Sequence, residues 1–290
     1  MNIRKAVLPV AGLGTRVLPA TKSMPKEMLP IFDRPALQYV VDEALAAGVE
    51  HIVFVTGRNK ASIEDYFDRA FELEAVLERT GKIGALESLR SSLPEPGQFS
   101  FVRQQSPLGL GHAIWCARDV IGNEPFAVLL PDMVMRSAVP CLQQMAAAFA
   151  RSGGNIVSVQ DVPREQVSRY GIVDPAGADG DLIRIRGMVE KPSVDTAPST
   201  MMISGRYILQ PEIFSLIEAQ DPGAGGEIQL TDAMVTLMER SDFYALPFDG
   251  EIFDTGSKTG YLEAFAAFAL ADRQHGEAVR TILERLLAAR

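Results

Sequence analysis

The sequence has only two cysteines and three histidines. Cys116 and Cys141 lie far apart in apolar, helix-like surroundings, and the histidines are isolated from one another. Disulfide frameworks and cysteine–histidine metal sites need several such residues at short, regular spacings. We therefore expect neither kind of site, and we expect both cysteines to be small core residues in a reducing compartment.

Long apolar runs and an excess of positive charge are also missing. No uncharged run reaches the roughly eighteen residues of a membrane-spanning helix, and the first ten residues lack the features of a signal peptide. The formal net charge is -9 at pH 7, which argues against a nucleic-acid-binding surface. We expect a cytoplasmic protein that binds neither membranes nor nucleic acid.

The patterns that are present indicate an α/β protein. Apolar runs at 6–10, 51–55 and 126–130 are typical of buried strands, and 36–47 and 61–67 have helical spacing. Strands that alternate with helices predict a parallel sheet with right-handed crossovers. The length of 290 residues fits one large domain or two ordinary ones.

The strand at 6–10 leads into a stretch that has the composition of a phosphate-binding loop. It reads Ala11-Gly12-Leu13-Gly14-Thr15-Arg16, and Lys22, Lys26 and Arg34 follow. Glycine lets backbone N–H groups approach an anion, and the cations balance its charge. In an acidic protein, such a locally basic loop indicates a site for one small anion.

Three other interpretations of this loop compete. A dinucleotide-binding fold needs G-x-G-x-x-G at a helix start, but Val17 takes the third glycine position and Pro19, Pro25 and Pro30 disfavour a helix. The P-loop pattern is absent. An ordinary glycine turn with surface cations needs no function, but the local excess of positive charge argues against it.

The whole stretch PVAGLGTRVLPATKSMPKEMLPI closely resembles the N-terminal signature of bacterial UTP–glucose-1-phosphate uridylyltransferases. These belong to the sugar-phosphate nucleotidyltransferases, whose pattern is G-x-G-T-R followed by P-K. The resemblance implies a Rossmann-like three-layer α/β/α nucleotidyltransferase fold with a mixed, mostly parallel sheet and C-terminal helices. It also implies transfer of the uridylyl group of UTP to glucose 1-phosphate, giving UDP-glucose and pyrophosphate, with Mg²⁺ as cofactor.

We divide the chain on this basis. A nucleotidyltransferase domain spans 1–256, with a nucleotide-binding half at about 1–135 and a sugar-binding half at about 136–256. A charged helical insertion at about 68–98 contains FELEAVLE, which resembles a segment of the UTP–glucose branch. Residues 257–290 form helices too apolar for a tail in water, so we expect packing on the domain or on a partner subunit, in a homodimer or homotetramer.

A second glycine stretch, from Gln105 to Gly111, follows a predicted strand at 99–104. From the residues alone it fits a base-reading loop and an ordinary turn equally well, and we expect His112 to serve packing or the helix start. The resemblance implies that Gln105 and Gly111 contact uracil. The predicted nucleotide-binding residues are Ala11, Gly12, Gly14, Thr15, Gln105, Pro107, Gly109 and Gly111.

Asp132 follows the apolar strand at 126–130, where a carboxylate faces the ligand crevice of an α/β sheet. One carboxylate with phosphate oxygens is a normal Mg²⁺ shell, although a lone Asp more often caps a turn. The resemblance favours metal, with Asp254 as a second metal or sugar-nucleotide carboxylate. The predicted metal ligands are Asp132 and Asp254.

The predicted sugar-binding residues are Asp132, Gly171, Glu190, Lys191 and Gly205. Neighbours on a strand normally point to opposite faces, so we expect Pro192 to end the strand and turn Glu190 and Lys191 toward the cleft. Thr231 and Asp232, in a G-E-x-Q-L-T-D match, serve to cap a helix or to build the site.

The predicted catalytic residues are Arg16, Lys26 and Lys191. The resemblance implies that Arg16 and Lys26 hold the leaving pyrophosphate and that Lys191 holds the glucose phosphate. The alternatives are the same chemistry with dTTP or galactose 1-phosphate, a nicotinamide-dependent oxidoreductase, and a non-catalytic sugar-nucleotide sensor.

Overall fold

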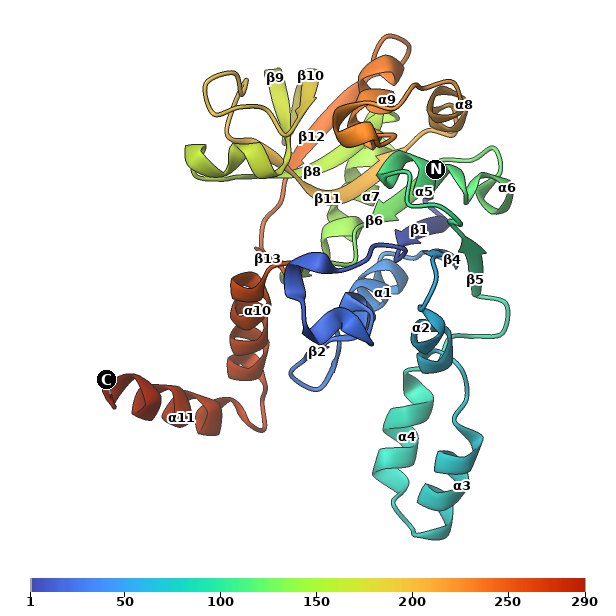
Figure 1. The fold of residues 1–290 in the computed structure, drawn as a ribbon, viewed down its shortest axis with the longest axis vertical. Helices are drawn as coiled ribbons and strands as arrows, with labels where there is room; N and C mark the ends of the chain where they lie inside the picture. The colour runs from blue at the N-terminus through green and yellow to red at the C-terminus, as the bar shows by residue number, and fades with distance from the viewer. Residues whose placement is uncertain (1, 290) are drawn as a thin grey trace.

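A nine-stranded sheet runs through the protein (Figure 1). The computed structural model describes residues 2–289. Across the sheet the strands are β5 (Phe99–Arg103), β4 (His51–Thr56), β1 (Lys5–Pro9), β6 (Phe126–Leu129), β11 (Met201–Leu209), β8 (Asn155–Asp161), β12 (Phe243–Pro247), β10 (Leu182–Glu190) and β9 (Gly171–Asp179). Two small sheets pair β2 (Pro30–Ile31) with β3 (Arg34–Pro35), and β7 (Met133–Arg136) with β13 (Glu251–Asp254).

The sheet is mixed, and its two halves differ in strand direction. In the nucleotide half, β5, β4, β1 and β6 are mutually parallel, as the alternation of strands and helices predicts. In the sugar half, β11 is antiparallel to both β6 and β8, and β10 is antiparallel to both β12 and β9. Strands β8 and β12 of the sugar half are again parallel to each other. The sheet is therefore mixed, as predicted, with all neighbouring strands parallel in the nucleotide half and both directions present in the sugar half, where a tight turn joins β9 directly to β10 as a hairpin.

Helices cover both faces of the sheet and complete three layers. The α-helices are α1 (Ala36–Ala46), α2 (Ala61–Tyr66), α3 (Phe71–Arg79), α4 (Ile83–Ser91), α5 (Leu110–Trp115), α6 (Arg118–Ile121), α7 (Cys141–Ser152), α8 (Ile213–Glu218), α9 (Leu230–Leu237), α10 (Lys258–Ala271) and α11 (Gly276–Ala288). The 3-10 helices are η1 (Thr15–Val17), η2 (Ala20–Lys22), η3 (Lys26–Met28), η4 (Arg164–Arg169) and η5 (Ala224–Gly226).

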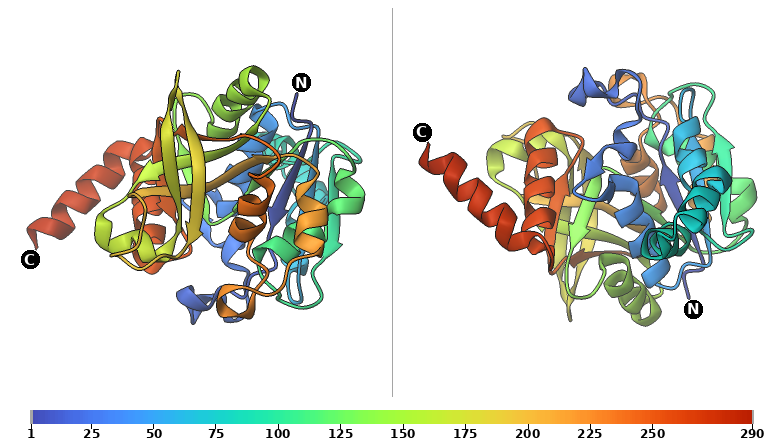
Figure 2. Two further views of the ribbon diagram at one scale, coloured as in Figure 1. Left: turned by 90° about the horizontal axis from the view of Figure 1, so that it is seen from above. Right: turned by 90° about the horizontal axis from the view of Figure 1, so that it is seen from below.

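Side chains that alternate along the central strands build two separate cores. In β1, Leu8 packs in a core with α1 and α7, whereas Val7 packs in a core with α5, α8 and α9. Both residues are fully buried, as expected for a strand covered on both faces. Figure 2 shows the helices on either side of the sheet, which confirms the predicted α/β/α layers.

A buried ion pair ties β11 to α1. Arg206 is fully buried and donates from Nη2 to Glu43 Oε2 at 2.8 Å, from Nε to Glu43 Oε1 at 3.0 Å and from Nη1 to Leu130 O at 3.1 Å. Its neighbours Gly205 and Tyr207 point the other way and line a cavity. Of these three consecutive residues, Gly205 and Tyr207 therefore line the cavity and Arg206 lies in the core.

The helices predicted within 68–98 are present as α3 and α4, which project from the body (Figure 1). Of the two C-terminal helices, α10 packs on the body: Tyr261 Oη donates to Pro30 O at 2.6 Å, and the Phe268 ring lies 4.5 Å from that of Tyr39. By contrast, α11 extends away from the body (Figures 1 and 2). Within residues 2–289, no helix is both long and apolar enough to cross a membrane.

Candidate active site

Two adjoining cavities are lined by residues that follow the carboxyl ends of β1, β5, β6 and β10. We call them the strand-end cavity, of about 620 Å³, and the glycine-loop cavity, of about 420 Å³. The residues that line both are Thr15, Leu110, Leu130, Asp132 and Glu227. The two cavities therefore form one continuous site.

The structure brings most of the predicted site residues to these cavities. The strand-end cavity is lined by Thr15, Arg16, Asp132, Gly171, Glu190, Lys191, Gly205 and Asp254. The glycine-loop cavity is lined by Ala11, Gly12, Gly14, Thr15, Lys26, Pro107, Gly109 and Asp132. The predicted roles of Arg16 at the pyrophosphate and Lys191 at the glucose phosphate require that the two residues share a pocket. Both of them line the strand-end cavity.

The glycine loop follows β1 as a series of short turns. The segment that contains Pro19 and Pro25 forms the 3-10 helices η1, η2 and η3, where a dinucleotide-binding fold would have one long α-helix. Lys26 begins η3, and its side chain lies in the glycine-loop cavity. The predicted absence of a helix through this stretch is confirmed.

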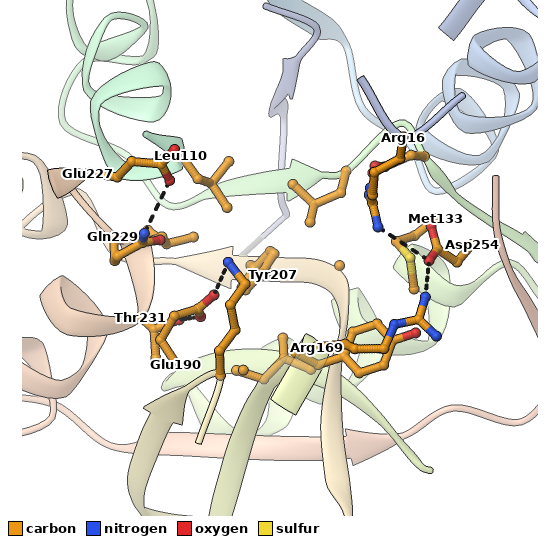
Figure 3. A pocket seen from close by; sticks show the side chains of 18 of the residues that line it. Arg16, Leu110, Met133, Arg169, Glu190, Tyr207, Glu227, Gln229, Thr231 and Asp254 are labelled. Carbon is orange, nitrogen blue, oxygen red and sulfur yellow. Dashed lines mark hydrogen bonds and ion pairs between the residues drawn. The ribbon is translucent and has the colours of Figure 1, made fainter. Parts of the chain in front are cut away.

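A cluster of charges joins the two cavities. Lys26 Nζ lies 2.5 Å from Asp132 Oδ2, and Arg16 Nη2 lies 3.4 Å from the same oxygen. Arg16 Nη1 lies 3.6 Å from Asp254 Oδ2, to which Arg169 Nη2 donates at 3.2 Å. Figure 3 shows Arg16, Arg169 and Asp254 together at one end of the strand-end cavity. Three cations thus converge on two carboxylates at the point where the strands end.

The charges of this cluster stabilise one another. Burial alone would raise the pKa of Asp132, but the ammonium of Lys26 and the guanidinium of Arg16, with a backbone hydrogen bond, together outweigh burial and hold that pKa below its ordinary value. Burial alone would lower the pKa of Lys26, but Asp132 and Glu27 raise it. Both side chains are therefore charged near neutral pH.

Gly256 lets the two carboxylates approach each other. A Cβ atom at this position would lie 2.5 Å from Arg16 Nη2, 2.9 Å from Asp132 Oδ2 and 3.0 Å from Asp254 Oδ1. The Gly256 N–H also donates to Asp254 Oδ1 at 3.1 Å. Any side chain here would push the charged groups apart, so the glycine is part of the site.

The other end of the strand-end cavity carries Glu190 and Lys191 (Figure 3 labels Glu190). Strand β10 ends at Glu190, and Lys191 has a positive φ of 46°. This left-handed turn, just before Pro192, brings both side chains to the cavity, with Lys191 Nζ 3.2 Å from Glu190 Oε1. The predicted turn is present, and the backbone of Lys191 makes it.

Thr231 supports Glu190. Its Oγ1 donates to Glu190 Oε2 at 2.7 Å, and it lies in the first turn of α9, which begins at Leu230. The alternative that Thr231 caps this helix is wrong, because no side chain caps α9 and the hydroxyl is bonded to Glu190. The G-E-x-Q-L-T-D match thus builds the floor of the cavity.

Two of the predicted base-reading residues lie elsewhere. Gln105 is exposed and lines neither cavity, whereas the neighbouring Gln104 is 8% exposed and lines the glycine-loop cavity. Strand β5 ends at Arg103, so the inward-facing position after it is 104. Gly111 is buried, and its N–H donates to Ile228 O at 2.9 Å; it packs the loop and does not line the site.

The backbone of Gly109 shows why the second stretch needs a glycine at this position. Its φ is 105°, and a Cβ there would lie 2.7 Å from Ile228 O. The Ile228 N–H in turn donates to Leu108 O at 2.7 Å. The loop after β5 is therefore held directly against the segment before α9, and only glycine permits that contact.

The sequence interpretation missed several residues that line the site. Arg169 lies two residues before the predicted Gly171, and its guanidinium contacts Asp254. Gln104, Glu227 and Gln229 also line the cavities. The signals were present in the neighbouring motifs, but nothing in the sequence shows which member of a motif points inward.

The metal prediction concerns Asp132 and Asp254 alone. Within the part of the chain that the structure describes, no group of three or more His, Cys, Asp or Glu side chains is arranged to hold a metal ion. The two carboxylates nevertheless converge at Gly256, and carboxylate oxygens are suitable Mg²⁺ ligands. The donor set therefore fits a Mg²⁺ ion whose remaining ligands are phosphate oxygens and water.

Comparison with known proteins gives close matches over nearly the whole chain. The model of the protein family described as "Nucleotidyl transferase" matches residues 5–270 of this chain. A UTP–glucose-1-phosphate uridylyltransferase of Bacillus subtilis (strain 168) is 47% identical over 286 residues, which cover 99% of this chain and 98% of that protein. These matches extend well beyond the N-terminal signature.

Two solved structures are similar to this chain in fold and sequence. A UTP-bound UGPase from Acinetobacter baumannii has a TM-score of 0.90 and 44% identity, covering 98% of this chain and 99% of that one. A UDP-glucose pyrophosphorylase complexed with UDP-glucose has a TM-score of 0.84 and 44% identity, covering 92% and 98% of the two chains.

Proposed function

Because the chain belongs to the nucleotidyl transferase family, we propose that the two joined cavities carry out its reaction. The protein transfers the uridylyl group of UTP to glucose 1-phosphate and releases pyrophosphate, giving UDP-glucose. It is therefore an enzyme, a UTP–glucose-1-phosphate uridylyltransferase. The alternatives with an oxidoreductase or a non-catalytic sensor have no support in the comparisons.

One observation carries the assignment of roles: cations from distant parts of the chain line one continuous site. Arg16 and Lys191 lie on the strand-end cavity, and Lys26 lies on the glycine-loop cavity, with Asp132 at their junction. Two phosphorylated substrates repel each other, so a site that joins them needs positive charge on both sides. This arrangement supplies it.

The reaction needs positioning and charge neutralisation more than proton transfer. The phosphate oxygen of glucose 1-phosphate is already anionic, and it attacks the α-phosphorus of UTP in line with the leaving pyrophosphate. Arg16 and Lys26 hold the pyrophosphate and the charge that develops on it. Lys191 holds the attacking phosphate. The side chain of Arg16 is 58% exposed, so a phosphate can reach the guanidinium without any other part of the protein having to move.

The hexose is placed at the Glu190 end of the strand-end cavity. Glu190 accepts from Thr231 Oγ1 and pairs with Lys191, which leaves it oriented to accept hydrogen bonds from sugar hydroxyls. The backbones of Gly171 and Gly205 line the same cavity. A side chain at Gly171 would approach Glu190 Oε2 to 3.2 Å, so glycine keeps this space open for the sugar.

The uracil ring is placed against the second glycine stretch. Gln104 takes the base-reading role predicted for Gln105, because Gln104 is the amide that lines the glycine-loop cavity. Pro107 and Gly109 line the same cavity, as does the loop from Ala11 to Thr15 on the phosphate side. The base and the triphosphate of one UTP molecule therefore share this cavity.

Mg²⁺ is the proposed cofactor, held by Asp132 and Asp254. When bound, the ion supplies a Lewis acid that neutralises phosphate charge. Lys26, Arg16 and Arg169 form ion pairs with the same two carboxylates. These cations are thereby kept close to the position of the phosphates before substrate enters.

The test is pyrophosphate release, measured with a panel of nucleoside triphosphates and sugar 1-phosphates, with and without Mg²⁺. We expect turnover with UTP and glucose 1-phosphate, and much slower turnover with dTTP or galactose 1-phosphate. Asp132→Asn should lower turnover and raise the Mg²⁺ concentration needed for half-maximal rate, because one metal ligand is weakened. Asp179→Asn, on the β9–β10 hairpin, is the matched control.

An unchanged Mg²⁺ titration in Asp132→Asn would contradict the metal assignment without affecting the substrate assignment. Self-association as a homodimer or homotetramer, and a cytoplasmic location, also belong to the proposal and rest on the sequence analysis. The exposed apolar side of α11 supports self-association.

A further inference from the structure

The amide of Gln104 is held by two hydrogen-bond partners. Its Nε2 donates to Gly109 O at 3.0 Å and lies 3.1 Å from His112 Nδ1. Gln104 follows β5, Gly109 belongs to the glycine stretch, and His112 lies in the first turns of α5. Three consecutive structural elements therefore meet at one side chain.

These contacts fix which way the amide faces. A backbone carbonyl can only accept a hydrogen bond, so the Gln104 atom that faces Gly109 O must be the NH₂ group. His112 Nδ1 faces the same NH₂ group and must then be an acceptor, which places the proton of the neutral ring on Nε2. Both N–H bonds of Gln104 are used in this way.

The group that remains is Oε1, a hydrogen-bond acceptor. Among the described residues, the side-chain hydrogen bonds of Gln104 are the two that its Nε2 makes, and Gln104 lines the glycine-loop cavity. Uracil has a donor, N–H, at ring position 3, whereas cytosine has an unprotonated acceptor nitrogen there. An acceptor held at this point therefore favours uracil and opposes cytosine, since two acceptors facing each other leave both unsatisfied.

We propose that His112 is a specificity-determining positioning residue, which holds the Gln104 amide so that its carbonyl oxygen reads the base of the nucleotide. The inference rests on the proposed function, because it presupposes that the base occupies the glycine-loop cavity. It goes beyond that function in assigning the choice between uracil and cytosine to a residue that lines neither cavity.

The surroundings of His112 suit this role. The His112 ring stacks on Trp115 with the ring centroids 5.8 Å apart. The Arg118 guanidinium lies over the Trp115 ring, 3.6 Å from its centroid. Partial burial lowers the pKa of His112, which keeps the ring neutral and Nδ1 able to accept. If the His112 ring were protonated, its Nδ1–H would face the N–H of the Gln104 amide, and the hydrogen bond between the two side chains would be lost.

The test compares kcat/KM for UTP with that for CTP, at saturating glucose 1-phosphate and Mg²⁺. Where CTP turns over too slowly, its inhibition constant against UTP replaces kcat/KM. His112→Phe keeps an aromatic ring over Trp115 but removes the acceptor. We expect it to lower the preference for UTP about tenfold, mainly through a higher KM for UTP, because one hydrogen bond that orients the amide is lost.

His112→Gln supplies an acceptor amide oxygen and should restore most of the preference. Trp115→Phe disturbs the packing of the imidazole ring but leaves its nitrogen, so it should keep the wild-type preference. An unchanged preference in His112→Phe, or an equal loss in Trp115→Phe, would overturn the proposal. Failure of the wild-type protein to use UTP at all would instead refute the proposed function, and this inference with it.

Discussion

Arg16 reaches both carboxylates of the charge cluster, yet neither contact is tight. Its guanidinium lies 3.4 Å from Asp132 and 3.6 Å from Asp254. Exposed ion pairs at such distances contribute little to stability. The charge of Arg16 is therefore available to a phosphate, and its loss should affect the reaction much more than the fold.

We predict that Arg16→Ala lowers kcat by about 10³–10⁵, by analogy with arginines that neutralise transferring phosphates elsewhere. The urea unfolding midpoint should stay close to that of the wild type. Steady-state pyrophosphate release and urea titration measure the two quantities. Arg34→Ala, an exposed arginine paired with Asp33 and Asp42 outside both cavities, is the control. Near-normal turnover in Arg16→Ala would remove this residue from the mechanism.

Single positions also show where the sequence was sufficient and where it was not. The G-x-G-T-R pattern pointed to the glycine loop and Arg16, which line the two cavities, because the whole motif is specific. The amide predicted to contact uracil, Gln105, lines neither cavity, whereas its neighbour Gln104 lines the glycine-loop cavity. Side chains alternate along an extended chain, so a shift of one residue reverses the direction of the side chain, and the residue at which β5 ends is visible only in the structure.

At the scale of elements, Glu74 joins the two helices of the insertion. It lies on α3 with its side chain 4% exposed, and accepts from Arg69 Nη2 at 2.6 Å and from Arg90 Nε, on α4, at 3.0 Å. The hydrogen bond from Arg69 is the main cause that lowers the pKa of Glu74, to about 2. The pairing of α3 with α4 therefore depends on a charged carboxylate.

This pKa sets the direction of a pH effect. Because the pKa of Glu74 is lower in the folded than in the unfolded state, its stabilisation is complete above about pH 4.5 and is lost as the pH falls toward 2. We predict that the unfolding free energy, measured by urea titration at about pH 6 and pH 3, falls more in the wild type than in Glu74→Gln. The exposed Glu72→Gln on the same helix should keep the wild-type pH dependence; a loss of it there as well would contradict the assignment.

The elements themselves were largely predictable, but their pairing was not. Periodicity placed β4, α1 and α2 within one residue of their observed bounds, because the apolar spacing that marks a strand or a helix is a local signal. Local sequence also fixes the start of α7 at Cys141, since Pro140 occupies its N-cap. The antiparallel pairing of β11 with β6 and β8 depends on contacts between strands that are distant in the sequence, and no local pattern encodes these contacts.

At the scale of the whole molecule, the candidate active site is formed by distant segments that meet where strands of the sheet end. Arg16 follows β1, Asp132 follows β6 and Lys191 follows β10, and all three line the strand-end cavity. Spacing in the sequence cannot show that these residues meet. The resemblance to a family located the residues, and the continuous nine-stranded sheet explains why they share one site.

The C-terminal helices show the opposite case, in which the structure leaves apolar surface uncovered. Tyr261 and Phe268 hold α10 on the body, but on α11 Ile282, Leu286 and Leu287 are 46%, 57% and 74% exposed. Ile282 and Leu286 are one helical turn apart on the same side. Within residues 2–289, α11 buries only Gly276, so packing on its own body does not account for this apolar side.

We predict that α11 packs against a second copy of the chain and that the wild-type protein is a homodimer or homotetramer. Ile282→Glu combined with Leu286→Glu should lower the mass measured by light scattering to that of a monomer, because charge would then have to be buried in the interface. Glu284→Gln on the same helix leaves the apolar side intact and should keep the wild-type mass. A wild-type mass that stays monomeric at every concentration would refute self-association, and the exposed leucines would then need a different partner.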